Sequence, residues 1–238
     1  MIEPQTSPDH AHVDIEDRAY AILHAGGLVL LQTDVGYGLV AMRDRAVQRI
    51  YELKGRPSSK PCVTLADASI IHDLVSRTDP RVLAWVDRTS RRTPIAVIAP
   101  LNPASRLLAG LSPYMRGQTT TAGTIATFYS AGPRVMRLAA RAWADGMVLV
   151  GSSANSSGTG NNYALADVPE AMRAGADLVI DDGRARYHQP DGIATTMLDL
   201  TKGTFQRRGI HYRQIEAAWR SFCRETAGGA GREQSATA

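Results

Sequence analysis

The sequence has few cysteines and none of the cysteine spacings typical of secreted or metal-binding proteins. Cys62 and Cys223 form no Cys-x-x-Cys pair, so we expect them to be free thiols in a reducing compartment. No apolar run approaches the roughly 20 residues that cross a membrane, and segment 1–12 lacks the apolar core of a signal peptide. These absences predict a cytoplasmic protein with no membrane partner.

Several common catalytic and binding motifs are also missing. The chain has no Gly-x-x-x-x-Gly-Lys-Ser/Thr phosphate loop and no Gly-x-Ser-x-Gly nucleophile elbow. Its six histidines are scattered without metal-ligand spacing, and Asp181–Asp182 is typical of a turn at the end of a strand. We therefore expect no metal site built from protein side chains.

The composition is that of a folded domain with a moderate preference for anions. The chain has 238 residues, 44% of them hydrophobic, a net charge of +4 and a pI of about 9.3. This length supports one large domain or two small ones, and no Pro-, Gly- or Ser-rich linker divides it. The basic balance suits anionic ligands or RNA, but it is weaker than in dedicated nucleic-acid-binding proteins.

Short apolar runs alternate with amphipathic segments, which indicates an α/β fold. A hairpin over 194–207 predicts a mixed sheet. We expect a single domain over 14–226, between a disordered N-terminal arm at 1–13 and a disordered tail at 227–238. The expected strands lie at 28–31, 39–42, 62–65, 94–99, 124–129, 147–150, 178–180, 194–200 and 204–207. The expected helices lie at 14–24, 46–54, 68–75, 80–87, 105–111, 133–144, 168–174 and 212–224, and segment 112–123 is predicted to be a mobile loop.

The most informative segment is Leu-Lys-Gly-Arg-Pro-Ser-Ser-Lys-Pro at 53–61, which places three cations close together. The prolines that follow Arg56 and Lys60 favour extended backbone, so the preceding helix is expected to end here. Lys54 and Arg56 are then free to converge on one anion, such as a polyphosphate or a carboxylate. The alternative is that these cations only complement the dipole of the helix end.

Two further polar motifs directly follow predicted strands. Gly-Ser-Ser-Ala-Asn-Ser-Ser-Gly at 151–158 would expose backbone N–H groups and hydroxyls at the edge of the sheet, where α/β proteins bind ligands. Thr-Asp-Val-Gly-Tyr-Gly-Leu at 33–39 offers groups that bind ligand hydroxyls or amines. The alternatives are an ordinary polar loop for the first motif and an Asx turn with a packed tyrosine for the second.

Together and in this order, the three motifs resemble the YrdC/Sua5 family of threonylcarbamoyl-AMP synthases, over about residues 19–210. The resemblance implies a twisted, open α/β sheet with a positively charged cavity. It also implies formation of threonylcarbamoyl-AMP from L-threonine, bicarbonate and ATP with Mg²⁺, for modification of tRNA adenosine 37 by a separate transferase complex. The matching residues are Thr33, Asp34, Tyr37, Gly38, Leu39, Lys54, Arg56, Lys60, Pro61, Ser153, Asn155, Ser157 and Gly158, with Thr195–Asp199 and Arg207–Gly209 resembling later motifs.

The resemblance assigns expected roles to three groups of residues. The catalytic group is Lys54, Arg56, Ser153 and Asn155. The group that binds ATP is Lys60, Ser152, Ser157, Thr196 and Arg207. The group that binds the amine substrate is Thr33, Asp34 and Tyr37.

The sequence also departs from the family pattern, which leaves the substrate open. Gln32 replaces a proline, Val35 and Ala96 each replace a threonine, and Thr127–Tyr129 lacks an arginine for which Arg116 or Arg134 are candidate substitutes. These changes favour an alternative, a specialised paralogue that uses carbamoyl phosphate or another small amine. A third hypothesis is a non-catalytic RNA-binding module, whose affinity would fall steeply with salt.

Overall fold

The computed structural model describes residues 8–76 and 78–233, and the side chains of 14–76 and 78–227. In this part of the chain, ten strands form one mixed sheet in the order β10-β9-β4-β6-β3-β7-β2-β1-β8, with β5 paired to β6. The strands are β1 (Val29–Thr33), β2 (Gly36–Ala41), β3 (Val63–Leu65), β4 (Ile95–Pro100), β5 (Thr120–Thr121), β6 (Thr124–Tyr129), β7 (Val150–Ser153), β8 (Leu178–Ile180), β9 (Thr196–Asp199) and β10 (Thr204–Arg207). The predicted class, a single open mixed sheet flanked by helices, is confirmed.

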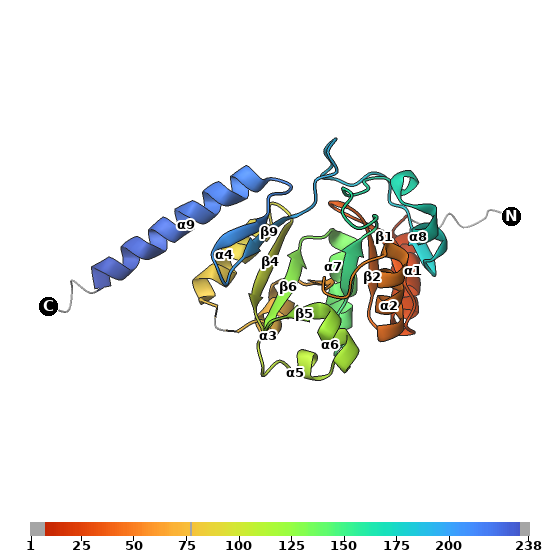
Figure 1. Cartoon of the computed structure of the whole chain (residues 1–238), viewed down its shortest axis with the longest axis horizontal. Helices are drawn as coiled ribbons and strands as arrows, with labels where there is room; N and C mark the ends of the chain where they lie inside the picture. The colour runs from red at the N-terminus through yellow and green to blue at the C-terminus, as the bar shows by residue number, and fades with distance from the viewer. Residues whose placement is uncertain (1–7, 77, 234–238) are drawn as a thin grey trace.

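Helices flank the sheet, and the last one extends away from it at the end of the molecule opposite α1 (Figure 1). None of the helices in the described ranges is both long and apolar enough to span a membrane. The helices are α1 (Pro8–His24), α2 (Asp44–Lys54), α3 (Ala68–Leu74), α4 (Pro80–Ser90), α5 (Arg106–Ala109), α6 (Pro113–Thr119), α7 (Pro133–Ala144), α8 (Glu170–Ala174) and α9 (Tyr212–Glu233), with a 3₁₀ turn at Leu165–Asp167.

Helix α2 positions the basic motif. It buries Val47, Ile50 and Tyr51, whose spacing of three and four residues places them on one face of the helix. Gly55 ends the helix in a left-handed conformation, with φ of 54°. A residue with a side chain adopts that conformation only at a cost, so glycine here lets the chain leave the helix toward Arg56.

The terminal helices are longer than the sequence predicts. Helix α1 begins at Pro8 rather than at residue 14, and proline is well suited to the first turn of a helix. Helix α9 continues to Glu233 through a glycine-rich stretch that we expected to be disordered. Glycine lowers helix propensity without forbidding the conformation. Residues 1–7 and 234–238 of the expected arm and tail lie outside the described residues.

Segment 112–123 is not the loop that we predicted. It forms α6 and the short strand β5, which pairs with β6. The Ser112 hydroxyl caps the helix by accepting a hydrogen bond from the Met115 amide at 3.0 Å, and Pro113 follows at the first helical position. A serine followed by proline is a helix-start signal. In the sequence alone, Gly117 and the threonines of this segment favour a loop instead.

Two motifs predicted to be loops contribute to strands instead. Strand β7 contains Gly151, Ser152 and Ser153, which pair with β2. A Cβ atom on Gly151 would lie 3.1 Å from the carbonyl oxygen of Leu39, so the close approach of β7 to β2 favours glycine there. Strands β1 and β2 form a tight hairpin around Asp34–Val35, and the polar turn predicted over 32–38 is therefore shorter.

Candidate functional site

A cleft of about 720 Å³, counted with its open mouth, lies over the centre of the sheet. We call it the central cleft. Its polar groups include Arg56, Ser152, Ser153 and Arg207, which come from the segment after α2 and from β7 and β10. Most sequence motifs described above therefore meet in one place.

Arg56 is held in the cleft by neighbouring oxygen atoms. Its Nε donates to the carbonyl oxygen of Lys60 at 3.0 Å, and its Nη2 donates to that of Pro61 at 2.8 Å. Its Nη1 lies 3.4 Å from the Ser152 hydroxyl on β7. The guanidinium group is thus oriented by the protein while one edge remains directed toward the cleft-lining serine.

Arg207 approaches the same cleft from the end of β10. Its Nε donates to the carbonyl oxygen of Thr195 at 2.7 Å. Arg207 is exposed as a residue, but its guanidinium group is largely buried. This burial is the main reason why the pKa of Arg207 is lowered, and the charge of Arg56 lowers it further. Two like charges therefore influence each other here, and the described residues that line the cleft include no carboxylate. This electrostatic environment favours an anionic ligand.

Lys54 is placed differently from the prediction, because it does not converge with Arg56 on open space. Its side chain is 5% exposed and does not line the cleft. Its Nζ donates to the carbonyl oxygen of Ser153, to that of Asn155 at 2.6 Å and to Asn155 Oδ1 at 3.2 Å. Burial, and then the charge of Arg56, lower the pKa of Lys54 to about 8.

Ser153 and Asn155 form the polar end of β7. Ser153 lines the cleft, and its hydroxyl donates to Asn155 Oδ1. Asn155 Nδ2 donates to the carbonyl oxygens of Ser156 at 3.0 Å and Thr159 at 2.5 Å. Asn155 therefore joins the lysine, the serine and the 156–159 loop.

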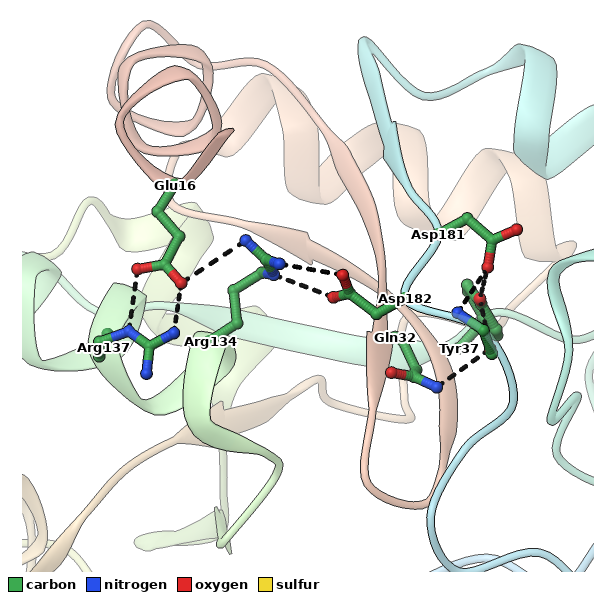
Figure 2. Close-up of polar contacts among 8 residues, drawn as sticks. Glu16, Gln32, Tyr37, Arg134, Arg137, Asp181 and Asp182 are labelled. Atoms are coloured by element: carbon green, nitrogen blue, oxygen red, sulfur yellow. Dashed lines mark hydrogen bonds and ion pairs between the residues drawn. The ribbon is translucent and has the colours of Figure 1, made fainter. Parts of the chain in front are cut away.

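The β1–β2 hairpin closes another side of the cleft. Thr33 lines it, but its hydroxyl donates to the carbonyl oxygen of Gly36 at 2.6 Å and accepts from the Val35 amide at 3.2 Å. Tyr37 also lines the cleft, whereas its hydroxyl contacts Asp181 (Figure 2). Burial, followed by the hydrogen bond to Asp181, raises the pKa of Tyr37, so this hydroxyl stays protonated.

The sequence model of the Sua5/YciO/YrdC family, described as "Telomere recombination", matches residues 21–209. The chain belongs to this family. A comparison with curated proteins finds no match.

Solved structures share the fold of this Sua5/YciO/YrdC family member at low sequence identity. The hypothetical protein smu.1377c of Streptococcus mutans is 19% identical with a TM-score of 0.72, over 86% of this chain and 90% of its own. The Sua5 protein of P. abyssi, crystallised with L-threonine, is 23% identical with a TM-score of 0.66, over 83% of this chain and 54% of its own. Full-length HypF, in a phosphate- and nucleotide-bound form, is 15% identical with a TM-score of 0.61, over 82% of this chain and 29% of its own. The chain thus spans about half the length of the matched Sua5 protein.

Besides Lys54 and Asn155, four further residues selected from the family motifs do not line the central cleft. The Thr196 hydroxyl is buried, donates to the carbonyl oxygen of Ile210 at 2.7 Å and accepts from the Gly209 amide at 3.0 Å. Lys60 and Ser157 are exposed beside the cleft rather than lining it. Asp34 lines a separate cavity.

The departures from the family pattern change the cleft lining as well. Val35 and Ala96 present apolar surface in the cleft where the family has hydroxyls. Gln32 lies outside the lining and donates from Nε2 to the carbonyl oxygen of Gly183 at 3.0 Å. Neither candidate substitute for the missing arginine lines the cleft, because Arg116 is exposed on α6 and Arg134 is paired with acidic residues.

Residues that we did not assign to the site also line the cleft. They include Thr195, Phe128 and Asn161, whose Nδ2 donates to the carbonyl oxygen of Val35 at 2.7 Å. The alternation of β6 predicts the direction of Phe128, and Thr195 is one residue from the threonine that we selected. Asn161 had no local sequence signal, since its role depends on contact with a distant hairpin. Among the described residues, no group of three or more His, Cys, Asp or Glu side chains is placed to hold a metal.

Proposed function

We propose that this protein forms a carbamoyl-type adenylate from ATP, with L-threonine and bicarbonate as the leading co-substrates and pyrophosphate as the product. In this reaction a carbamate oxygen attacks the α-phosphorus of ATP. The new bond joins that oxygen to phosphorus, and the bond between the α-phosphorus and the bridging oxygen breaks to release pyrophosphate. The threonylcarbamoyl-AMP formed would then serve a separate tRNA-modifying transferase complex.

The observation that carries this proposal is a pair of arginines in a cleft whose described lining residues include no carboxylate. Negative charge increases on the phosphate oxygens during the attack, and the guanidinium groups of Arg56 and Arg207 would stabilise it. Ser152 and Ser153 would hold oxygens of the nucleotide or the carbamate. Thr33 and Tyr37 would shape the amine side of the cleft. No covalent nucleophile is required, so positioning and charge stabilisation would carry the reaction.

The role of Lys54 and Asn155 in this proposal is to hold the end of β7 in place. Both are engaged with each other and with Ser153, so they would act through the serine rather than on the phosphates. Mg²⁺ would enter with the nucleotide and supply charge neutralisation of the phosphates. The cleft lining offers serine hydroxyls but no carboxylate, which fits a magnesium ion carried by the phosphates of its substrate.

A second candidate, a reaction with carbamoyl phosphate, is favoured by the apolar lining at Val35 and Ala96. A hydroxyl on the amino-acid substrate would find fewer polar partners there than in a pocket lined by threonines. Carbamoyl phosphate has no side chain to accommodate, and its two negative charges suit the arginine pair. Full-length HypF, 29% of which matches this chain, has been solved in a phosphate- and nucleotide-bound form, and this supports testing such ligands here.

The test is pyrophosphate release from ATP and Mg²⁺ in four parallel reactions. These contain L-threonine with bicarbonate, bicarbonate alone, another small amino acid with bicarbonate, or carbamoyl phosphate. Threonine-dependent release supports the first candidate, and release only with carbamoyl phosphate supports the second. Release in none of the four contradicts the proposal.

Variants connect the activity to the cleft. Arg56→Gln and Arg207→Gln each remove one guanidinium group and are expected to lower kcat/KM by at least about 100-fold, since each loses charged hydrogen bonds to the phosphates. Arg116→Gln is the matched control, because that arginine is exposed on α6 outside the cleft, and its kcat/KM is expected to stay within about twofold. Equal activity of the cleft variants and the control would reject the site.

A further inference from the structure

A second cavity is lined in part by the turn of the β1–β2 hairpin. It measures about 600 Å³, counted with its open mouth, and we call it the arginine cavity. Asp34, in the turn after β1, lines it, although the neighbouring Thr33 at the end of β1 lines the central cleft. The motif residue that the proposed function does not use therefore belongs to a different cavity.

The arginine cavity has an excess of positive charge. Arg91 and Arg92, after α4, and Arg186, on the segment that follows β8, line it together with the single carboxylate of Asp34. Within the described residues, the Arg91 and Arg92 guanidinium groups make no hydrogen bond or ion pair. Arg186 reaches Asp34 only at 4.0 Å and lies over the Tyr187 ring at 5.1 Å. Three guanidinium groups thus have most of their donors available.

The wall of this cavity is fixed by backbone contacts rather than by the arginines. The Asp34 amide donates to the carbonyl oxygen of Ala131, and the Tyr187 amide donates to that of Asp34, both at 2.8 Å. Thr93 Oγ1 lies 2.7 Å from His211 Nδ1. These contacts join the separate segments that form the wall of the cavity, and the arginine side chains complete its lining.

The nearby acidic groups only partly offset this charge. Burial raises the pKa of Asp34, while Arg186 acts in the opposite direction. A second carboxylate, that of Asp87 on α4, interacts with Arg91 and also with His72. Helix α7 has its N-terminus at the cavity, where Gly132 and Pro133 are lining residues and no side chain caps the helix. The helix dipole therefore adds positive potential to the cavity.

We propose that the arginine cavity is a second anion site, which binds a small phosphate-bearing molecule such as pyrophosphate. Arginine forks match phosphate oxygens in geometry as well as in charge. Asp34 reduces the affinity for anions, but the three arginines leave the lining with a net positive charge. This site is independent of the proposed reaction, because it shares no lining residue with the central cleft.

The experiment is calorimetric titration of the full chain with inorganic pyrophosphate at fixed ionic strength and without Mg²⁺, with inorganic phosphate in a parallel arm. The wild type is expected to show two classes of site for pyrophosphate. The triple variant Arg91→Gln/Arg92→Gln/Arg186→Gln should weaken one class by at least about tenfold, since it loses charged hydrogen bonds. Arg207→Gln should weaken the other class and leave this one unchanged. Asp34→Asn should tighten binding in the arginine cavity by severalfold.

The matched control is Arg45→Gln/Arg106→Gln/Arg116→Gln, which removes the same charge from exposed positions outside both cavities. It is expected to keep both classes of site. The proposal is rejected if the wild type has a single class that Arg207→Gln removes. It is also rejected if the triple variant binds like the wild type, or if the control weakens binding as much as the triple variant does. Pyrophosphate release by the wild type tests the proposed reaction separately.

Discussion

Lys54 illustrates how a residue at a functional motif acts through its neighbours. All three of its ammonium protons have acceptors on Ser153 and Asn155, so the side chain joins the end of α2 to the end of β7. The burial that allows these bonds also disfavours the charge, which lowers the pKa to about 8. In the proposed function Lys54 is therefore a positioning residue, and its pKa of about 8 lies in an accessible pH range.

We expect kcat/KM to fall as the pH rises through about 8, because the neutral amine offers one donor fewer to the end of β7. The pH dependence of kcat/KM for pyrophosphate release measures this. Two titratable groups act on Lys54: Arg56 lowers its pKa further, whereas Cys62, whose own pKa is raised by burial, acts in the opposite direction. Lys54→Arg keeps a positive charge at every pH and should lack this limb of the profile. A wild-type profile that stays flat to pH 10 would contradict the interpretation.

The same shift has the opposite effect on stability. A lysine in the unfolded chain keeps its proton until a pH near its ordinary value of 10.5, whereas folded Lys54 loses it near 8. The unfolded state therefore binds more protons between these values, and the free energy of unfolding rises with pH there. Urea unfolding at pH 8 and pH 10 should show this increase for the wild type relative to Lys54→Met. An equal pH dependence in both would show that the group does not titrate in this window.

At the scale of elements, local signals predicted regular structure better than they predicted the site. Helix α7 and strand β8 have the bounds that we expected, because a starting proline and a short apolar run define them. Strand β7 lies three residues later than predicted, since its pairing with β2 and β3 decides where it begins. Such pairing is a long-range property, and no local pattern in Gly151–Ser153 reports it.

A one-residue difference can decide whether a side chain of a predicted motif lines the central cleft. Thr196 was expected to bind the nucleotide, but the pleat turns it inward and brings Thr195 to the cleft. Thr33, at the end of β1, and Asp34, in the turn that follows, also line different cavities. The motif identified the segment in each case, and the register of the sheet decided which of its residues faces a cavity.

Arg134 connects three elements in a partly buried ion-pair network. It lies on α7, contacts Asp182 after β8 through Nε at 3.0 Å and Nη2 at 2.9 Å, and lies 3.5 Å from Glu16 on α1 (Figure 2). Its side chain is 9% exposed, whereas that of Arg137, which also pairs with Glu16, is 59% exposed. The two arginines form a natural comparison between a buried and an exposed ion pair.

Replacing Arg134 with methionine is expected to lower the free energy of unfolding by about 2 kcal/mol, because Asp182 and Glu16 lose a partly buried partner. For a chain of this size the melting temperature should fall by about 4–8 °C. Arg137→Met is the matched control and should cost less than about 1 kcal/mol, since solvent screens its pair. Thermal unfolding followed by circular dichroism measures both. Equal losses would mean that burial does not determine the strength of this network.

At the scale of the whole molecule, the central cleft depends on segments far apart in the sequence. The chain between β8 and β9 crosses from one edge of the sheet toward the other and contributes Ala194 and Thr195 to the cleft. Earlier in this segment, contacts from Gln32 and Tyr37 fix the turn at Asp181–Gly183 (Figure 2). A ligand in the cleft would therefore contact both the hairpin and this crossing segment, and so would stabilise the fold as a unit.

ATP with Mg²⁺ at about 100 times its Kd is expected to stabilise the folded state by about 2.7 kcal/mol, because in the proposed function it would bind only the assembled cleft. The melting temperature should rise by about 5–10 °C, as followed by differential scanning fluorimetry. Adenosine, which lacks phosphates, should give a much smaller shift at the same concentration, since it cannot pair with Arg56 or Arg207. Arg56→Gln/Arg207→Gln should lose most of the ATP-dependent shift, whereas the exposed control Arg116→Gln should keep it. A full shift in the double variant would place the nucleotide elsewhere, and the arginine cavity would then be the first region to test by substitution.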